Sequence, residues 1–118
     1  RPGALAALTT ASFDRRLAAL TIGKDKAGAS RIIKLPPETA EFFAAQCRDK
    51  LPAAPLFARA DGQPWNKDAW KKPVKVAAEA ARLPADVTAY TLRHSVITDL
   101  IASGLDVLTV ARLSGTSL

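Results

Sequence analysis

Cysteine, histidine, tyrosine and methionine are scarce or missing in this sequence. Its 118 residues contain one cysteine, Cys47, one histidine, His94, one tyrosine, Tyr90, and no methionine. A single cysteine excludes an internal disulfide and fits a reducing cytoplasm. A single histidine without cysteine or carboxylate partners at suitable spacing provides no metal site. Cys47 and His94 also lack a local nucleophile signature, so the sequence gives poor support to a cysteine or serine hydrolase.

Long apolar runs and acidic residues are also in short supply. No run approaches the roughly 18 apolar residues that a membrane span needs, and no signal peptide is visible. Seventeen Lys and Arg residues against eleven Asp and Glu give a net charge of +6. This balance favours a polyanionic partner, with a merely soluble basic protein as the alternative. Apolar residues make up 48% of the chain, which is enough for a core, and the length suits a single domain over 1–118.

Both ends of the chain indicate a piece of a larger protein. The sequence begins at Arg1–Gly3 without an initiator methionine, and it stops at Gly115–Leu118 without a closing helix or polar tail. We therefore expect a domain that is truncated at both ends.

The first half of the chain is predicted to hold a β-hairpin between two helices. Two apolar runs flank a polar, glycine-containing loop, which is the pattern of a hairpin. Pro36 and Pro37 stop the second strand and start a helix, in which Phe42 and Phe43 supply core side chains. The expected elements are a helix over 4–8, a turn at 12–14, strands over 17–22 and 31–35 around a loop at 23–30, and a helix over 38–48.

The second half is predicted to be helical. Asn66 is an N-cap for a helix to about residue 82, which Pro73 should bend or delay. A helix over 88–103 follows, and Asp106 caps a last short helix that Gly115 ends. The helix over 88–103 carries an apolar stripe at helical spacing, made of Leu92, Val96, Ile97, Leu100 and Ile101. The fold class that results is a mostly helical α+β domain with one small antiparallel sheet.

The start of the helix over 88–103 carries the most chemically suggestive residues. Tyr90 and Arg93 are three apart and share a helix face, and a helix N-terminus suits a phosphate. Arg93 flanks the apolar stripe, so it must be paired or meet an anion. A salt bridge to Asp86 or Asp99 is the structural alternative. For His94, a half-buried histidine that satisfies backbone groups is the simpler interpretation.

Two groups of lysines could contact an anionic polymer. One group lies at the hairpin tip, where a lysine can reach a groove or a phosphate. The other lies on one face of the helix over 66–82 and could follow a DNA backbone, which gives affinity without sequence specificity. Ordinary solvated charge is the alternative for both. The groups are Lys24 with Lys26, and Lys71 with Lys72 and Lys75.

In this order, these residues resemble the catalytic domain of the tyrosine recombinase (phage integrase) family. The segment over 1–8 looks like the helix with the family's first catalytic arginine. The segment over 25–28, with the strand over 31–35, resembles the hairpin that bears the catalytic lysine. Leu92-Arg93-His94 resembles the His-x-x-Arg-His box, and the segment over 113–117 is similar to the Leu-Gly-His-Ser turn.

The resemblance implies a role for each matching position. Arg1 and Arg93 would be the two catalytic arginines, and Lys26 would be the catalytic lysine, with Lys24 as the alternative. Tyr90 stands where the box has its first histidine, and Thr116 stands where the turn has histidine. Contacts to DNA outside this set are expected from Lys24, His94, Lys71, Lys72 and Lys75.

Three replacements and one missing residue set this chain apart from the family pattern. Tyr90 and Thr116 replace histidines, and Ala4 replaces the usual acidic residue after the first arginine, so we expect a divergent subgroup. The nucleophilic tyrosine would lie several residues beyond Leu118. Tyr90 occupies a histidine position, and we do not assign it as the nucleophile.

The resemblance implies cleavage and rejoining of double-stranded DNA through a 3′-phosphotyrosyl link, without a metal or nucleotide cofactor. The parent protein would be a cytoplasmic site-specific recombinase that acts as a homotetramer on DNA, and this piece alone would be monomeric and inactive. Two alternatives stay open. The chain could be a non-catalytic DNA-binding module derived from a recombinase, or an unrelated basic protein-binding domain.

Overall fold

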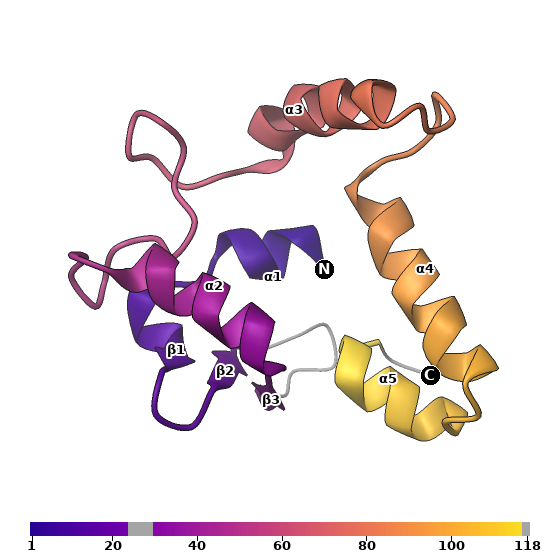
Figure 1. The fold of residues 1–118 in the computed structure, drawn as a ribbon, viewed down its shortest axis with the longest axis horizontal. Coiled ribbons are helices and arrows are strands. Elements are labelled where there is room, and N and C mark those ends of the chain that lie inside the picture. Colours follow the sequence, from indigo (N-terminus) through magenta and orange to yellow (C-terminus); the bar gives the residue numbers. More distant parts are fainter. Residues whose placement is uncertain (24–29, 117–118) are drawn as a thin grey trace. The chain divides into compact units, whose positions relative to one another are not determined.

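The computed structural model describes residues 1–23 and 30–116, and these form two compact units. One, which we call the sheet unit, is Ala4–Trp65. The other, the helical unit, contains Arg1–Gly3 and Asn66–Leu118. Figure 1 shows the order of the elements along the chain. The predicted hairpin loop falls largely on residues 24–29, which lie outside the described part.

The sheet unit contains an antiparallel sheet of three strands in the order β1-β2-β3. The predicted hairpin is confirmed as β2 (Ala19–Ile22) and β3 (Arg31–Lys34), with Leu20 opposite Ile33. The predicted turn at 12–14 was wrong, because Phe13–Asp14 forms β1 and pairs with β2. Its two residues carry too little alternation to be recognised as a strand. A 3₁₀ helix, η1 (Thr10–Ser12), leads directly into β1.

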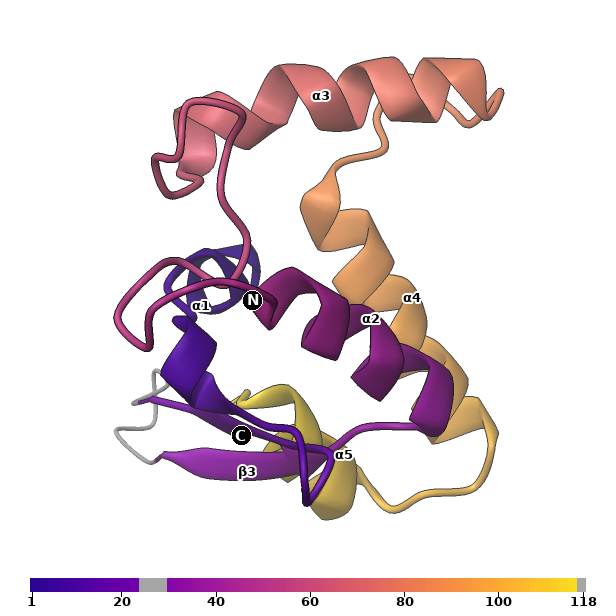
Figure 2. The same cartoon turned by 60° about the vertical axis from the view of Figure 1, so that its left-hand side comes forward.

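A helix covers this sheet and completes the core. Helix α2 (Pro37–Cys47) begins after Pro36, as expected, and lies against the sheet (Figure 2). The buried core consists of Leu8, Phe13, Leu20, Phe43 and Leu56, and the rings of Phe13 and Phe43 lie 5.8 Å apart.

The prediction that Phe42 and Phe43 both supply the core was half right. Phe43 is buried, whereas Phe42 is 55% exposed and stacks on Phe57 with ring centroids 6.0 Å apart. Consecutive helix residues point about 100° apart, so only one of the pair can point straight into the core.

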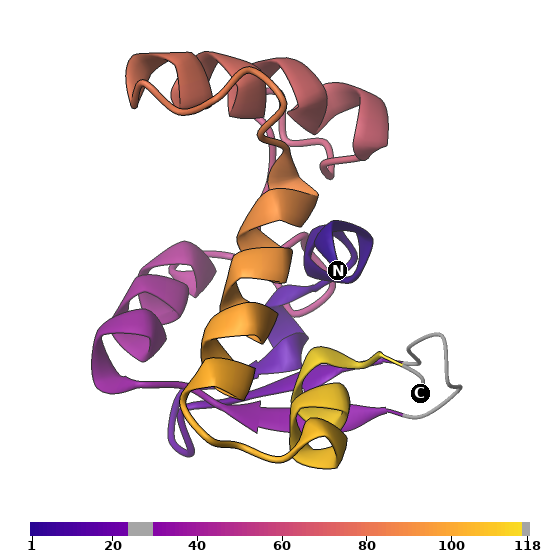
Figure 3. The same cartoon turned by 90° about the vertical axis from the view of Figure 1, so that its right-hand side faces the viewer.

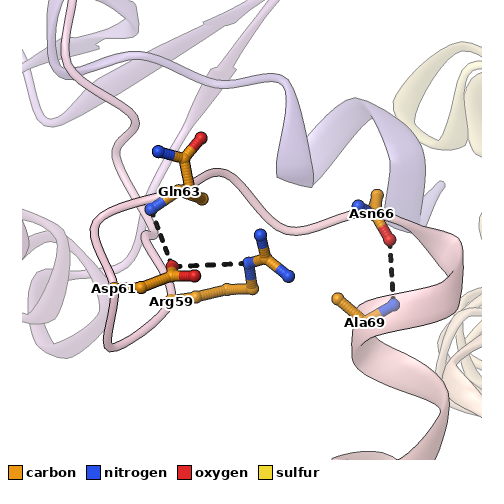
Figure 4. Close-up of polar contacts among 5 residues, drawn as sticks. All are labelled: Arg59, Asp61, Gln63, Asn66 and Ala69. Atoms are coloured by element: carbon orange, nitrogen blue, oxygen red, sulfur yellow. Dashed lines mark hydrogen bonds and ion pairs between the residues drawn. The ribbon is translucent and has the colours of Figure 1, made fainter.

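A first helix and a later turn are the remaining features of this part of the chain. Helix α1 (Pro2–Ala6) starts and ends two residues earlier than predicted, and Leu8 follows it into the core. Later in the chain, Asp61 Oδ1 accepts a hydrogen bond from the Gln63 amide at 3.0 Å and lies 3.7 Å from Arg59 Nε (Figure 4). These contacts close the predicted turn at Asp61-Gly62.

The helical unit begins with α3 (Lys67–Ala80). Asn66 Oδ1 accepts a hydrogen bond from the Ala69 amide at 2.9 Å, so Asn66 is the N-cap as predicted (Figure 4). Pro73 lies inside the helix without ending it. After Ala80 the chain turns at Arg82, whose φ of 58° is left-handed.

Helix α4 (Ala89–Ala102) is joined to α5 (Val107–Ser114) by a short turn, and the two helices pack on each other (Figure 3). Gly104, with φ of 99°, and the N-cap Asp106 shape this turn, as the sequence predicts. The Asp106 carboxylate accepts hydrogen bonds from the Thr109 amide at 2.9 Å and the Thr109 hydroxyl at 2.6 Å. These bonds hold the pKa of Asp106 below its ordinary value.

The predicted apolar stripe on α4 is only partly buried. Ile97 and Leu100 are half-buried, but Leu92, Val96 and Ile101 are 63%, 57% and 46% exposed. The eight residues of α5 are too few to cover the fourteen of α4. Within residues 1–23 and 30–116, no helix has both the length and the apolar character required to span a bilayer.

Candidate functional site

The helical unit joins two of the sequence motifs through their side chains. Arg93, on the second turn of α4, donates a hydrogen bond from Nη2 to Thr116 Oγ1 at 2.6 Å. The two residues come from the arginine-histidine box and from the later turn, which were recognised separately in the sequence. The structure thus places these motifs in direct contact.

The backbone of the second motif explains how Thr116 reaches Arg93. Gly115 follows α5 with φ of 68°, a left-handed conformation that favours glycine. The Thr116 amide donates to the Ala111 carbonyl at 3.0 Å and the Gly115 amide to the Arg112 carbonyl at 3.4 Å. This pair of bonds is a Schellman motif, which ends α5 and turns the chain back over its last turn.

Ser114 is a member of the site that sequence reasoning did not single out. Its hydroxyl donates to Thr116 Oγ1 at 3.0 Å and lies 3.3 Å from the Ala111 carbonyl oxygen. Its position two residues before Thr116 was the available signal, but a serine in a turn has many other uses.

The other predicted catalytic positions have different outcomes. Arg1 is half-buried and belongs to the same compact unit as Arg93 and Thr116. Tyr90 is 51% exposed and lines a groove beside α3. Lys24 and Lys26 lie outside the described residues, so the choice between them stays a prediction.

The groove beside α3 has a volume of about 680 Å³ and a basic lining. Lys71, Lys72 and Lys75 all line it and are all exposed, which agrees with the predicted basic face. Lys67 joins them, and none of the lining residues is acidic. The full lining consists of Lys67, Trp70, Lys71, Lys72, Val74, Lys75, Ala85, Val87, Thr88, Ala89 and Tyr90. Such a surface can hold an extended anion.

His94 and Cys47 lie in different parts of the chain, on α4 and at the end of α2. His94 is exposed on α4 rather than half-buried. Cys47 lies in the sheet unit, where burial raises the pKa of its thiol and Lys50 opposes that shift. Over residues 1–23 and 30–116, no three His, Cys, Asp or Glu side chains gather as a metal site would require.

The sequence profile of the Phage integrase family matches residues 1–117. The chain belongs to the phage integrase family. A comparison with curated protein sequences found no significant match. The assignment of Tyr90 and Thr116 to histidine positions of the family motifs stays a prediction.

Solved recombinase structures share the fold of this integrase-family chain. The crystal structure of XerA recombinase matches 100% of the chain with a TM-score of 0.84 and 18% identity. The Tn1549 transposon integrase in complex with transposon right end DNA gives the same TM-score and identity over 100% of the chain. In complex with circular intermediate DNA, that integrase matches with a TM-score of 0.82 and 18% identity, again over 100% of the chain.

These similarities confirm the predicted fold class, a mostly helical α+β domain with a small antiparallel sheet. The chain spans 44% of the XerA chain and 47% and 48% of the two integrase chains. At this level of identity the likeness concerns the fold alone.

Proposed function

We propose that this chain provides the phosphate-binding part of the catalytic site of a site-specific DNA recombinase. The observation that carries the proposal is the hydrogen bond of 2.6 Å between Arg93 and Thr116. It unites two motifs of the family, and a guanidinium presents a planar fork of donors that suits a phosphate. Membership of the phage integrase family supports the same activity.

In the proposed reaction, a tyrosine attacks the scissile phosphate and displaces the 5′-hydroxyl, which leaves a 3′-phosphotyrosyl link. Arg1 and Arg93 stabilise the negative charge that grows on the nonbridging oxygens, because guanidinium groups keep their charge and present a rigid fork of donors. Lys26, with Lys24 as the alternative, donates a proton to the departing hydroxyl. Tyr90 and Thr116 serve as neutral hydrogen-bond partners of the phosphate.

The nucleophile of this reaction would be supplied by residues that follow Leu118. Tyr90, the single tyrosine of the chain, stands on α4 in the arginine-histidine box and lines the α3 groove. We therefore propose that the parent is a cytoplasmic tyrosine recombinase and that the 118 residues cannot cleave DNA alone.

The proposed partner is double-stranded DNA. Lys71, Lys72 and Lys75 in the α3 groove would neutralise backbone phosphates, which requires no base contact. The net charge of +6 supports an approach to DNA by the whole chain. The two Tn1549 integrase structures contain DNA, which agrees with this partner.

The deciding experiment is covalent capture of DNA by a protein that continues past Leu118. It would be mixed with a nicked duplex that traps the cleaved strand, and adducts would be resolved by denaturing electrophoresis. We expect a protease-sensitive adduct at the 3′ phosphate. Arg93→Lys should slow its formation by about 100-fold or more, because a lysine cannot reproduce the fork of donors. Arg112→Lys, on the exposed part of α5, is the matched control and should form the adduct normally.

The second candidate is a non-catalytic DNA-binding module derived from a recombinase. The replacements at Tyr90, Thr116 and Ala4 favour it. This candidate predicts duplex binding without any adduct, even when the following residues are present. A parent sequence without a tyrosine shortly after Leu118 would favour it over the recombinase.

A further inference from the structure

The hydroxyl groups of Ser114 and Thr116 form a short chain that ends on Arg93. Arg93 Nη2 donates to Thr116 Oγ1 at 2.6 Å, and Ser114 Oγ donates to the same oxygen at 3.0 Å. Ser114 Oγ also lies 3.3 Å from the Ala111 carbonyl, but its single proton can make only one full hydrogen bond. The shorter contact, to Thr116, is the better bond.

The direction of these bonds fixes what Thr116 can do. A threonine hydroxyl has two acceptor lone pairs and one proton. Both bonds bring a proton to Oγ1, so the lone pairs are occupied and its own proton points away from Arg93 and Ser114. Toward an anion beside Arg93, Thr116 can therefore act only as a donor.

We propose that Thr116 is a positioning residue for Arg93 and that Ser114 holds Thr116 in its donor orientation. A bond to one terminal nitrogen restrains the plane of the guanidinium and, with it, the directions of its other N–H groups. Thr116 is suited to this role because a β-branched side chain has restricted χ1 rotation and its backbone is fixed by the turn at Gly115. The inference rests on the proposed function only in taking the anion to be a DNA phosphate.

The proposed arrangement differs chemically from one built with histidine. Serine and threonine hydroxyls do not change charge near neutral pH, whereas histidine titrates there. The bond between Thr116 and Arg93 should therefore itself be independent of pH between about 5 and 8. Thr116→His should introduce a pH dependence of DNA affinity across this range, which the wild-type chain lacks at this position.

The contact can be tested directly by NMR of the ¹⁵N-labelled chain at low temperature. Arg93 would be assigned as the side-chain signal that disappears in Arg93→Lys. We expect resolved Nη signals in the wild type and in Thr116→Ser, because rotation of the guanidinium is restricted. Thr116→Val, which keeps the shape but removes the hydroxyl, should speed the rotation of the Arg93 guanidinium, seen as broader Nη signals that lie closer together than in the wild type. An unchanged rotation rate in Thr116→Val would overturn the proposal.

DNA affinity provides the second measurement, by fluorescence anisotropy with a labelled duplex. Thr116→Val should weaken binding by about tenfold, the equivalent of one hydrogen bond to a charged group, and Thr116→Ser should restore it to within about twofold of wild type. Ser114→Ala should cause a smaller loss, because it removes a bond to Thr116 and not to Arg93. Equal binding by Thr116→Val and the wild type would overturn the role of Thr116.

The two measurements separate this inference from the proposed function. If the wild-type chain does not bind duplex DNA, the proposed function fails, and the NMR comparison still decides whether Thr116 holds Arg93. If binding is normal and Thr116→Val changes neither measurement, the positioning role fails alone. Thr116 is exposed, so neither substitution at this position removes buried packing.

Discussion

Gly115 decides, at the scale of single residues, whether the two motifs of the site can meet. Its φ of 68° turns the chain back after α5 and delivers Thr116 to Arg93. Any L-residue with a side chain is strained in this conformation. The glycine is therefore a requirement of the site as well as of the helix end.

Gly115→Ala should lower the free energy of unfolding by roughly 1–2 kcal/mol, the cost of the left-handed conformation for alanine. Urea unfolding followed by circular dichroism measures this change. Gly3→Ala is the matched control, because Gly3 lies in α1 and an added Cβ would meet nothing within 4 Å. Alanine should be neutral or stabilising there. Equal destabilisation at both positions would contradict the assignment of strain to Gly115.

Helix α3 shows, at the scale of elements, how a basic face can hold an anionic polymer. Lys71 and Lys75 are one turn apart and line the same groove. Each lysine that contacts a DNA phosphate releases a counterion. Lys71→Gln and Lys75→Gln should therefore each make the negative slope of log affinity against log salt shallower by about 0.9.

Titration of a labelled duplex at several salt concentrations measures this slope. Arg48→Gln, an exposed site at the end of α2 in the sheet unit, removes the same charge and should leave the slope unchanged. A slope that changes equally in all three variants would indicate a general charge effect and no groove contact.

The start of α5 depends on a carboxylate whose pKa is lowered by its hydrogen bonds to Thr109. A lowered folded-state pKa means that the ionised form stabilises the fold above the unfolded pKa of about 3.9, and that this contribution is lost as the pH falls through the folded value. Asp106→Asn removes the charge but keeps an oxygen that can cap the helix.

We therefore expect wild type to be more stable than Asp106→Asn at neutral pH, with a difference that shrinks below about pH 4. Thermal unfolding across this range measures it. A difference that stayed constant with pH would show that charge on Asp106 does not contribute.

Prediction from sequence succeeded for elements with strong local signals. Asn66, Asp106, Gly104 and Gly115 mark helix ends by their own side chains or backbone freedom, and the structure confirms each of these ends. The two-residue strand β1 was missed, because its pairing with β2 is a tertiary contact.

The apolar stripe of α4 shows a second limit. Helical spacing correctly indicated a helix but could not show which neighbour covers each side chain, and Leu92 and Val96 are exposed. At the site, family motifs indicated Arg93 and Thr116 as members. The bond between them and the role of Ser114 depend on the turn geometry at Gly115, which spacing alone does not specify.

The whole molecule matches recombinase structures along its full length but spans less than half of theirs. A tetramer on DNA is the assembly proposed for the parent. We therefore expect the 118 residues to sediment as a monomer without DNA. With a short duplex, we expect a complex that holds one copy of the chain per duplex. Analytical ultracentrifugation checks this, and a stable tetramer of the chain alone would place the assembly contacts within it.

Cys47 gives the sheet unit a natural chemical reporter. Its thiol packs against the core cluster, is partly buried, and is the only one in the chain. A disulfide reagent can modify it at full rate only after the surrounding packing opens, and burial that raises its pKa slows the reaction further. The rate of modification therefore reports on the packing of this core without any engineered label, and DNA that stabilises the sheet unit would be detected as a slower rate.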